Sequence, residues 1–108
     1  EMSLDVTLIA IRPTSVFEAN ITHNLNQMAR ACGVYEHVWR PDELGIKTAS
    51  ELIEPLRWGV QALKLDPSHF KKYDARNAWG TYEQFLPWLE KYLEACVLNP
   101  DAAVSVSR

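Results

Sequence analysis

Apolar and polar residues alternate near both ends of the chain, which is typical of strands buried on one face. Strands are predicted over about residues 4–12, 15–20 and 103–107. Pro13 ends the first of them, because proline has no N–H to donate to a neighbouring strand. The short connection that follows favours an antiparallel pairing of the first two strands. The third suits an edge strand that is apolar on one face.

Between these strands, apolar residues recur at the three- and four-residue spacing of amphipathic helices. A first helix is predicted over about 22–32, with Gly33 at its left-handed end. Capping boxes mark two longer helices, one from Thr48 to about 65 and one from Thr81 to the turn at 99–101. Asp66 caps a short helix that reaches residue 70. Two prolines fall inside the predicted helices: Pro55 kinks its helix or marks the true first turn, and Pro87 predicts an irregularity.

These elements indicate an α+β fold: a small antiparallel sheet of about three strands, made of an N-terminal hairpin and a C-terminal strand, packed with three to four helices. With 108 residues, we expect a single globular domain over 1–108. The composition is that of a folded protein, with 47% hydrophobic and 23% charged residues. Cys32 and Cys96 lie on the apolar sides of predicted helices, so we expect buried free thiols rather than a disulfide.

Charge and hydropathy exclude several classes of protein. The net charge of −3, with scattered Lys and Arg, gives no basic footprint for nucleic-acid binding. No apolar run approaches the roughly 20 residues needed to span a bilayer, so we expect a cytoplasmic protein without a membrane partner. Glycine-rich phosphate loops, nucleophile elbows and zinc-ligand spacings are absent from the sequence, so we expect neither a metal nor a cofactor.

A stripe of amide side chains is the first candidate for functional chemistry. On a helix from about residue 22, one face would carry Asn20, His23, Asn24, Gln27 and Arg30. Amides offer donors and an acceptor together but do not serve as ordinary general acids or nucleophiles, so the stripe favours recognition over catalysis. The alternative is an N-cap followed by a solvated helix face.

Two aromatic segments are further candidates. In YEHVWRPDE, residues 35–43, Trp39 and Arg40 could stack a planar ligand and pair with an anion, although tryptophan is more often a core residue. The segment 69–83 combines aromatic residues with positive charge from Lys71, Lys72 and Arg76. Its candidate ligand contacts are Asn77, Trp79 and Tyr82. Asn77 tolerates a left-handed backbone, and Gly80 allows close approach before the Thr81 cap. The alternative is an ordered connection in which Trp79 fills the core.

The motifs SLDV, ANITHNLNQMA, YEHVWRPDELG, ASELIEPL, NAWGTYE, LEKYLEAC and NPDA, in this order, resemble a group of small proteins encoded by phages and prophages. The resemblance covers nearly the whole chain and implies a bacterial host cytoplasm, but no reaction. The group usually has Asn-Gly-Trp-Gly where this chain has residues 77–80, with Ala78 in place of the first glycine. If that glycine takes a positive φ, Ala78 either strains the loop or indicates that the conformation is not needed.

Three hypotheses follow. The first is a non-enzymatic module that binds a small polar ligand, with a nucleotide-like molecule as one candidate, through the amide stripe and the aromatic residues. The second is a protein that docks on a host or phage protein, since Trp, Tyr and Arg are also interface residues. The third, for which the sequence offers least, is a nucleotide hydrolase with His23 or His37 as base. Val104 and Val106 on the edge strand would also allow pairing of two copies.

Overall fold

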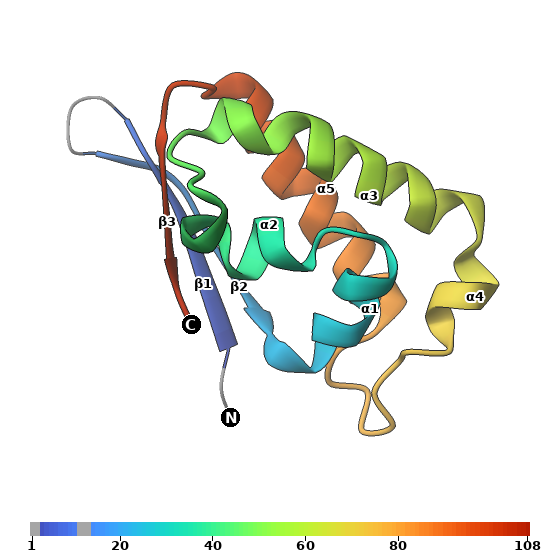
Figure 1. Ribbon diagram of the computed structural model, residues 1–108. Helices are drawn as coiled ribbons and strands as arrows, with labels where there is room; N and C mark the ends of the chain where they lie inside the picture. The colour runs from blue at the N-terminus through green and yellow to red at the C-terminus, as the bar shows by residue number, and fades with distance from the viewer. Residues whose placement is uncertain (1–2, 11–13) are drawn as a thin grey trace.

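A computed structural model describes residues 3–10 and 14–108 (Figure 1). The elements are, in order, β1 (Ser3–Ile9), β2 (Ser15–Thr22), the 3₁₀ helix η1 (His23–Leu25), α1 (Asn26–Ala31), α2 (Tyr35–Trp39), the 3₁₀ helices η2 (Pro41–Leu44) and η3 (Ala49–Leu52), α3 (Ile53–Leu65), α4 (Pro67–Lys71), α5 (Tyr82–Leu98) and β3 (Ala103–Ser107). The predicted α+β class is confirmed.

The three strands form one antiparallel sheet in the order β2-β1-β3. The N-terminal hairpin pairs Leu4 with Ile21 and Leu8 with Phe17, and the C-terminal strand pairs Val106 with Val6. Directly paired residues point to the same face of a sheet, so this register collects the apolar side chains on one face. Figure 1 shows the helices on that side of the sheet only.

Polar side chains occupy the uncovered face of the sheet. Asp5 pairs with Asn20 on one side and with Ser107 on the other, and Thr7 pairs with Glu18. The alternation noted in the sequence therefore reflects one face on the core and one in solvent.

Both predicted capping boxes are present. Glu51 accepts the backbone N–H of Thr48, and Gln84 accepts that of Thr81. The first box opens η3 rather than an α-helix, and α3 begins at Ile53, so Pro55 lies in the first turn of α3. Proline is tolerated there because the N–H groups of a first turn have no partner within the helix. By contrast, Pro87 lies inside α5, which continues through it.

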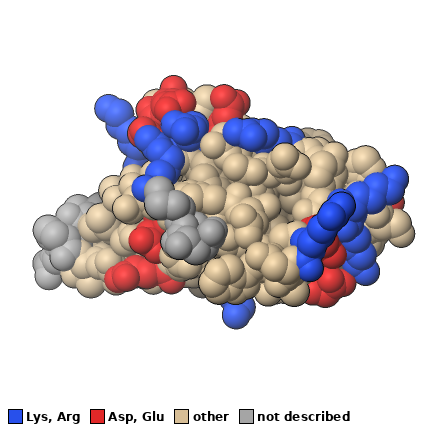
Figure 2. Space-filling model, turned by 90° about the horizontal axis from the view of Figure 1, so that it is seen from below, with Lys and Arg blue, Asp and Glu red and all other residues tan. Residues whose placement is uncertain are grey.

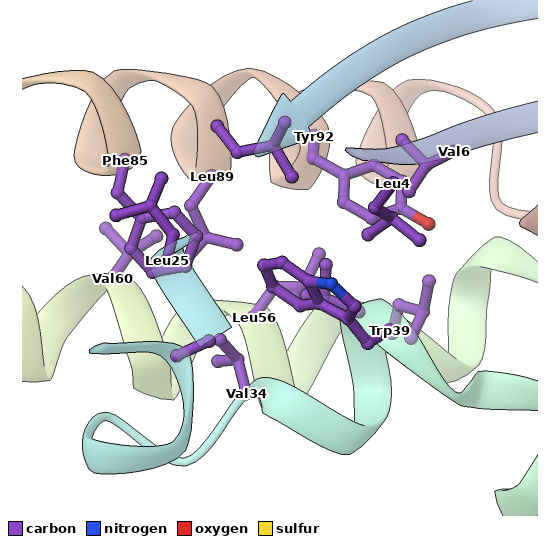
Figure 3. Packing of buried hydrophobic residues seen from close by; sticks show 14 of the residues in the cluster. Leu4, Val6, Leu25, Val34, Trp39, Leu56, Val60, Phe85, Leu89 and Tyr92 are labelled. Carbon is purple, nitrogen blue, oxygen red and sulfur yellow. The ribbon is translucent and has the colours of Figure 1, made fainter. Parts of the chain in front are cut away.

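The core lies between the sheet and the helices, and Trp39 of α2 is its largest fully buried side chain. Figure 3 shows its indole between Leu4 of β1 and Leu56 of α3. α3 and α5 pack along one another, and Tyr82 joins them by donating its hydroxyl hydrogen to the Leu63 carbonyl, at 2.6 Å. Trp39 is thus enclosed by the sheet and the long helices.

Several predicted boundaries differ from the structure. β1 is assigned to Ile9, whereas the predicted end of the strand and its proline fall at 11–13, outside the described residues. The segment 35–44 forms α2 and η2, which brings the described α-helices to five rather than three or four. α2 has five residues, too few for a periodic apolar pattern to appear in the sequence. No described helix is both long enough and apolar enough to cross a bilayer.

The valines of β3 also differ from expectation. Val104 and Val106 are half-buried against the core, not exposed for pairing between two copies. The outer edge of β3 is partly occupied, because the Val104 N–H donates to the Lys47 carbonyl at 3.0 Å and Thr48 bridges Ala103. These contacts cover the start of the outer edge, and pairing of two copies through the rest of β3 stays a prediction.

Gly59 is where α3 contacts the segment between α1 and α2. A Cβ atom at this position would overlap a methyl group of buried Val34. In an unobstructed helix, Gly→Ala stabilises by about 1 kcal/mol. We expect Gly59→Ala instead to destabilise the protein by about 1 to 3 kcal/mol in urea unfolding, because a packed core accommodates extra atoms poorly. In a Val34→Ala background the same change should lose most of its cost, and equal costs in both backgrounds would contradict this packing.

The two cysteines are free thiols, as predicted, but only Cys96 is fully buried, and Cys32 is half-buried. Burial raises the pKa of Cys32 to about 11 and that of Cys96 to about 12. We expect both to react with a disulfide reagent at least roughly 100-fold more slowly in the native protein than in urea, because a pKa raised by two units lowers the thiolate fraction by that factor. Stability should fall as pH rises above the ordinary thiol pKa, since the unfolded chain ionises first. Equal rates in both states would contradict the burial.

Candidate functional site

A surface hollow of about 680 Å³ lies between the start of the helical region and the loop before α5. One wall comes from η1 and α1, and the other from the segment 75–77. The lining side chains are mostly polar: His23, Asn24, Asn26, Gln27, Ala75, Arg76 and Asn77. The hollow therefore joins the amide stripe to part of the aromatic and basic loop.

The first wall is built by the turn from β2 into η1. Thr22 ends the strand with an extended backbone, and its hydroxyl accepts the Asn24 N–H at 3.2 Å. This is an ordinary N-cap. Because η1 has about three residues per turn and α1 has 3.6, the side chains of 23–27 do not follow the single α-helical stripe that the sequence predicts.

His23 links the hollow to the core. The Trp39 indole N–H donates to His23 Nδ1 at 2.8 Å, and the ring centroids are 6.3 Å apart. A buried indole N–H needs an acceptor, and His23 supplies it. The bond holds the imidazole between the core and the hollow, which His23 also lines.

The second wall depends on a strained turn in the segment 75–80. Ala78 has φ of 63°, in the left-handed region, and the Asn77 side chain accepts the Trp79 N–H at 3.0 Å. A glycine would take this conformation without strain, whereas alanine has a steric cost there. The left-handed conformation falls on Ala78, not on Asn77.

Two contacts hold the segment 75–80 against η1. The Asn24 amide donates to the Trp79 carbonyl at 2.8 Å. Gly80, with φ of 112°, lies so close that a Cβ atom there would be 3.0 Å from the Asn24 Cβ. The close approach predicted for Gly80 is confirmed, and it is made to η1. Asn24 thus holds the two walls together.

Arg76 is the one ionic group that lines the hollow. Among the described residues its guanidinium makes no hydrogen bond or ion pair. The Asp74 carboxylate accepts the Tyr82 N–H at the start of α5, at 2.7 Å, and makes no ion pair among the described residues. At the end of the molecule formed by α4 and the following loop, Lys and Arg side chains lie beside Asp and Glu (Figure 2), and Lys71 pairs with Glu83 at 3.2 Å. Within the lining, Arg76 is therefore the group with which an anion would pair.

The structure brings together part of the predicted site. His23, Asn24, Gln27 and Asn77 line the hollow. Trp79 lies beside it through its carbonyl, and its ring is 59% exposed rather than filling the core.

Two members of the amide stripe lie elsewhere. Asn20 belongs to β2, where its amide donates to Ser3 Oγ at 2.8 Å and to Asp5 Oδ1 at 2.6 Å on the outer face of the sheet. Arg30 lies over the Tyr35 ring, 4.0 Å from its centroid, beside a different hollow. The predicted stripe is wrong at both positions because the helix begins later, and with a 3₁₀ turn.

Three aromatic and basic candidates are held by the fold instead of facing the hollow. Trp39 is 2% exposed and Tyr82 is 7% exposed, so neither ring offers a face on which a ligand could stack. Arg40 is tied to the Tyr35 hydroxyl at 3.3 Å and to Glu43 at 2.7 Å. Trp39 and Tyr82 are therefore not part of the site because they are buried in the core, and Arg40 is not part of it because it is paired with Glu43.

Sequence reasoning missed two lining residues, Asn26 and Ala75, which carry no pattern that points to them. Arg76 was noted for its charge but not as a ligand contact, because its place in the lining depends on how the loop folds back onto η1. No cluster of three or more His, Cys, Asp or Glu within the described ranges could hold a metal.

Comparison with models of protein families, with curated proteins and with solved structures found no match to this chain.

The turn at Ala78 gives a direct test of the loop conformation. We expect Ala78→Gly to stabilise the protein by roughly 1 kcal/mol, a rise in Tm of about 4 to 8 °C, because glycine adopts a positive φ without strain. Differential scanning calorimetry would measure this shift. Ala75→Gly is the matched control and should lower Tm, since Ala75 has no positive φ. A lower Tm for Ala78→Gly as well would contradict the left-handed turn.

Proposed function

We propose that this protein is a non-enzymatic binding module whose site for a small polar ligand is the hollow between η1–α1 and the segment 75–77. The observation that carries the proposal is the meeting of two polar segments about fifty residues apart around one hollow. Its walls offer amide donors and acceptors together with one cation. That combination suits a ligand with both neutral polar groups and negative charge, and a nucleotide-like molecule has both.

The biological setting is part of the proposal. From the resemblance of its motifs to phage and prophage proteins, we propose that the chain is an accessory protein acting in the cytoplasm of a bacterial host. A module that sequesters a small polar molecule needs no catalytic group, which fits a lining of amides.

A thermal-shift screen against nucleotides, cyclic dinucleotides and NAD derivatives tests the binding module. A ligand that binds only the native state raises Tm by mass action, by about 2.7 kcal/mol of stability at one hundred times its Kd. We expect Gln27→Ala and Arg76→Gln to reduce the shift, since both side chains line the hollow. Gln61→Ala and Lys91→Gln, at exposed positions on α3 and α5, are the matched controls and should keep it.

The fate of the ligand separates binding from catalysis. Chromatography of the bound molecule should recover it unchanged. An altered ligand would favour the hydrolase hypothesis. A shift that survives both Gln27→Ala and Arg76→Gln would place the site outside this hollow.

One observation favours a docking protein as the second candidate. Trp79 projects from a conformationally fixed turn and is 59% exposed, and a rigid exposed tryptophan is a common centre of protein interfaces. If no small molecule shifts the Tm, a pull-down with wild type and Trp79→Ala should recover a partner with wild type only.

A further inference from the structure

We propose that the hollow receives a phosphate group, held by the Nε2–H of His23 and by Arg76, with the imidazole tautomer set by Trp39. This inference rests on the proposed binding function and names the chemical class of its ligand. It makes His23 and Arg76 ligand-contacting residues and Trp39 a positioning residue.

The tautomer follows from one hydrogen bond. An indole N–H can only donate, so His23 Nδ1 must accept it and carries no proton. In the neutral ring the proton is then on Nε2. Because Nδ1 faces Trp39 in the core and His23 also lines the hollow, the geometry assigns the Nε2–H to the hollow. His23 therefore presents a donor to the ligand.

The remaining polar groups complete a donor-rich site. The Arg76 guanidinium has no acidic partner among the described residues and presents several N–H groups, which match phosphate oxygens. Gln27 adds amide donors on the opposite wall. A phosphate offers more strong acceptor oxygens than a carboxylate, so it can use donors that converge from two walls.

The same geometry bears on the hydrolase hypothesis. A general base needs an unprotonated nitrogen within reach of its substrate. The unprotonated nitrogen of His23 is directed at the core, and the nitrogen directed at the hollow carries a proton. A base at His23 would need the other tautomer, which would break the bond to Trp39. We therefore assign His23 to binding.

Nitrogen NMR of the labelled histidines tests the tautomer without any ligand. At mildly alkaline pH, we expect the His23 Nε2 signal to have the shift of a protonated ring nitrogen and the Nδ1 signal that of a bare one. His23→Asn assigns the signals by removing them. Trp39→Phe should shift His23 towards a mixture of tautomers. If Trp39→Phe does not fold, the wild-type spectrum alone decides, and an Nδ1–H tautomer there would overturn the inference.

Binding measurements by calorimetry test the phosphate. We expect adenosine monophosphate to bind about tenfold or more tightly than adenosine, since hydrogen bonds to a charged group are the stronger ones. His23→Asn offers an oxygen near the Nδ1 position for Trp39 but places no N–H at the Nε2 position, so it should keep its fold and lose about tenfold in affinity. His23→Gln, with an amide near the Nε2 position, should lose less. Arg76→Gln should remove most of the preference for the monophosphate, and Lys91→Gln should leave it unchanged.

The arms of this experiment separate the two proposals. If inorganic phosphate displaces adenosine monophosphate, the inference is supported and phosphate alone is a sufficient ligand. If adenosine monophosphate binds more tightly than adenosine but inorganic phosphate does not displace it, the inference is supported for a phosphate carried by a nucleoside. Equal affinity for adenosine and its monophosphate would overturn the phosphate while leaving the binding module intact. No binding of any of the three would overturn the phosphate, and the wider thermal-shift screen would then decide the binding function.

Discussion

Burial of the Trp39 indole is the constraint on which this structure depends. The ring fills the space between the sheet and the long helices, and its N–H must find an acceptor because water is excluded there. His23 provides that acceptor from the start of η1, directly after β2. The Trp39 carbonyl in turn accepts a hydrogen bond from Arg108 at 2.9 Å. One residue of a five-residue helix thus connects the central core to segments at both ends of the chain.

The hollow is a consequence of this arrangement. The hydrogen bond from Trp39 holds the His23 ring at the boundary between the core and the hollow. The opposite wall follows from the turn at Ala78 and from the close approach of Gly80 to Asn24, which together fold the loop before α5 back onto η1. A strained non-glycine residue at a surface turn is maintained only when its surroundings hold it, and strain of this kind is common where a protein binds a ligand. The positions of both walls are therefore determined by contacts that also stabilise the fold.

Much of the fold could be predicted because its signals are local. Alternation with a period of two identified the strands, and capping boxes identified the starts of η3 and α5 from pairs of residues three positions apart. The prediction failed where the signal was short or where two helix types met. α2 is too short to show periodicity, and the sequence does not distinguish the 3₁₀ turn of η1 from the start of an α-helix. The predicted strand already reached Asn20, and β2 continues to Thr22, so Asn20 could not also share a helix face with Arg30.

For the candidate site, the sequence by itself determined the chemistry: an excess of amides near residues 20–27, a basic and aromatic loop near residues 69–83, and the lack of catalytic motifs. Only the tertiary structure decided which of these residues meet. Trp39 and Tyr82 went to the core because large rings gain more from burial than from exposure, whereas Arg76 and Asn77 reached the amide wall through the folding back of the loop. Residue types are fixed by sequence, but contacts between residues fifty positions apart depend on packing, which no local pattern records.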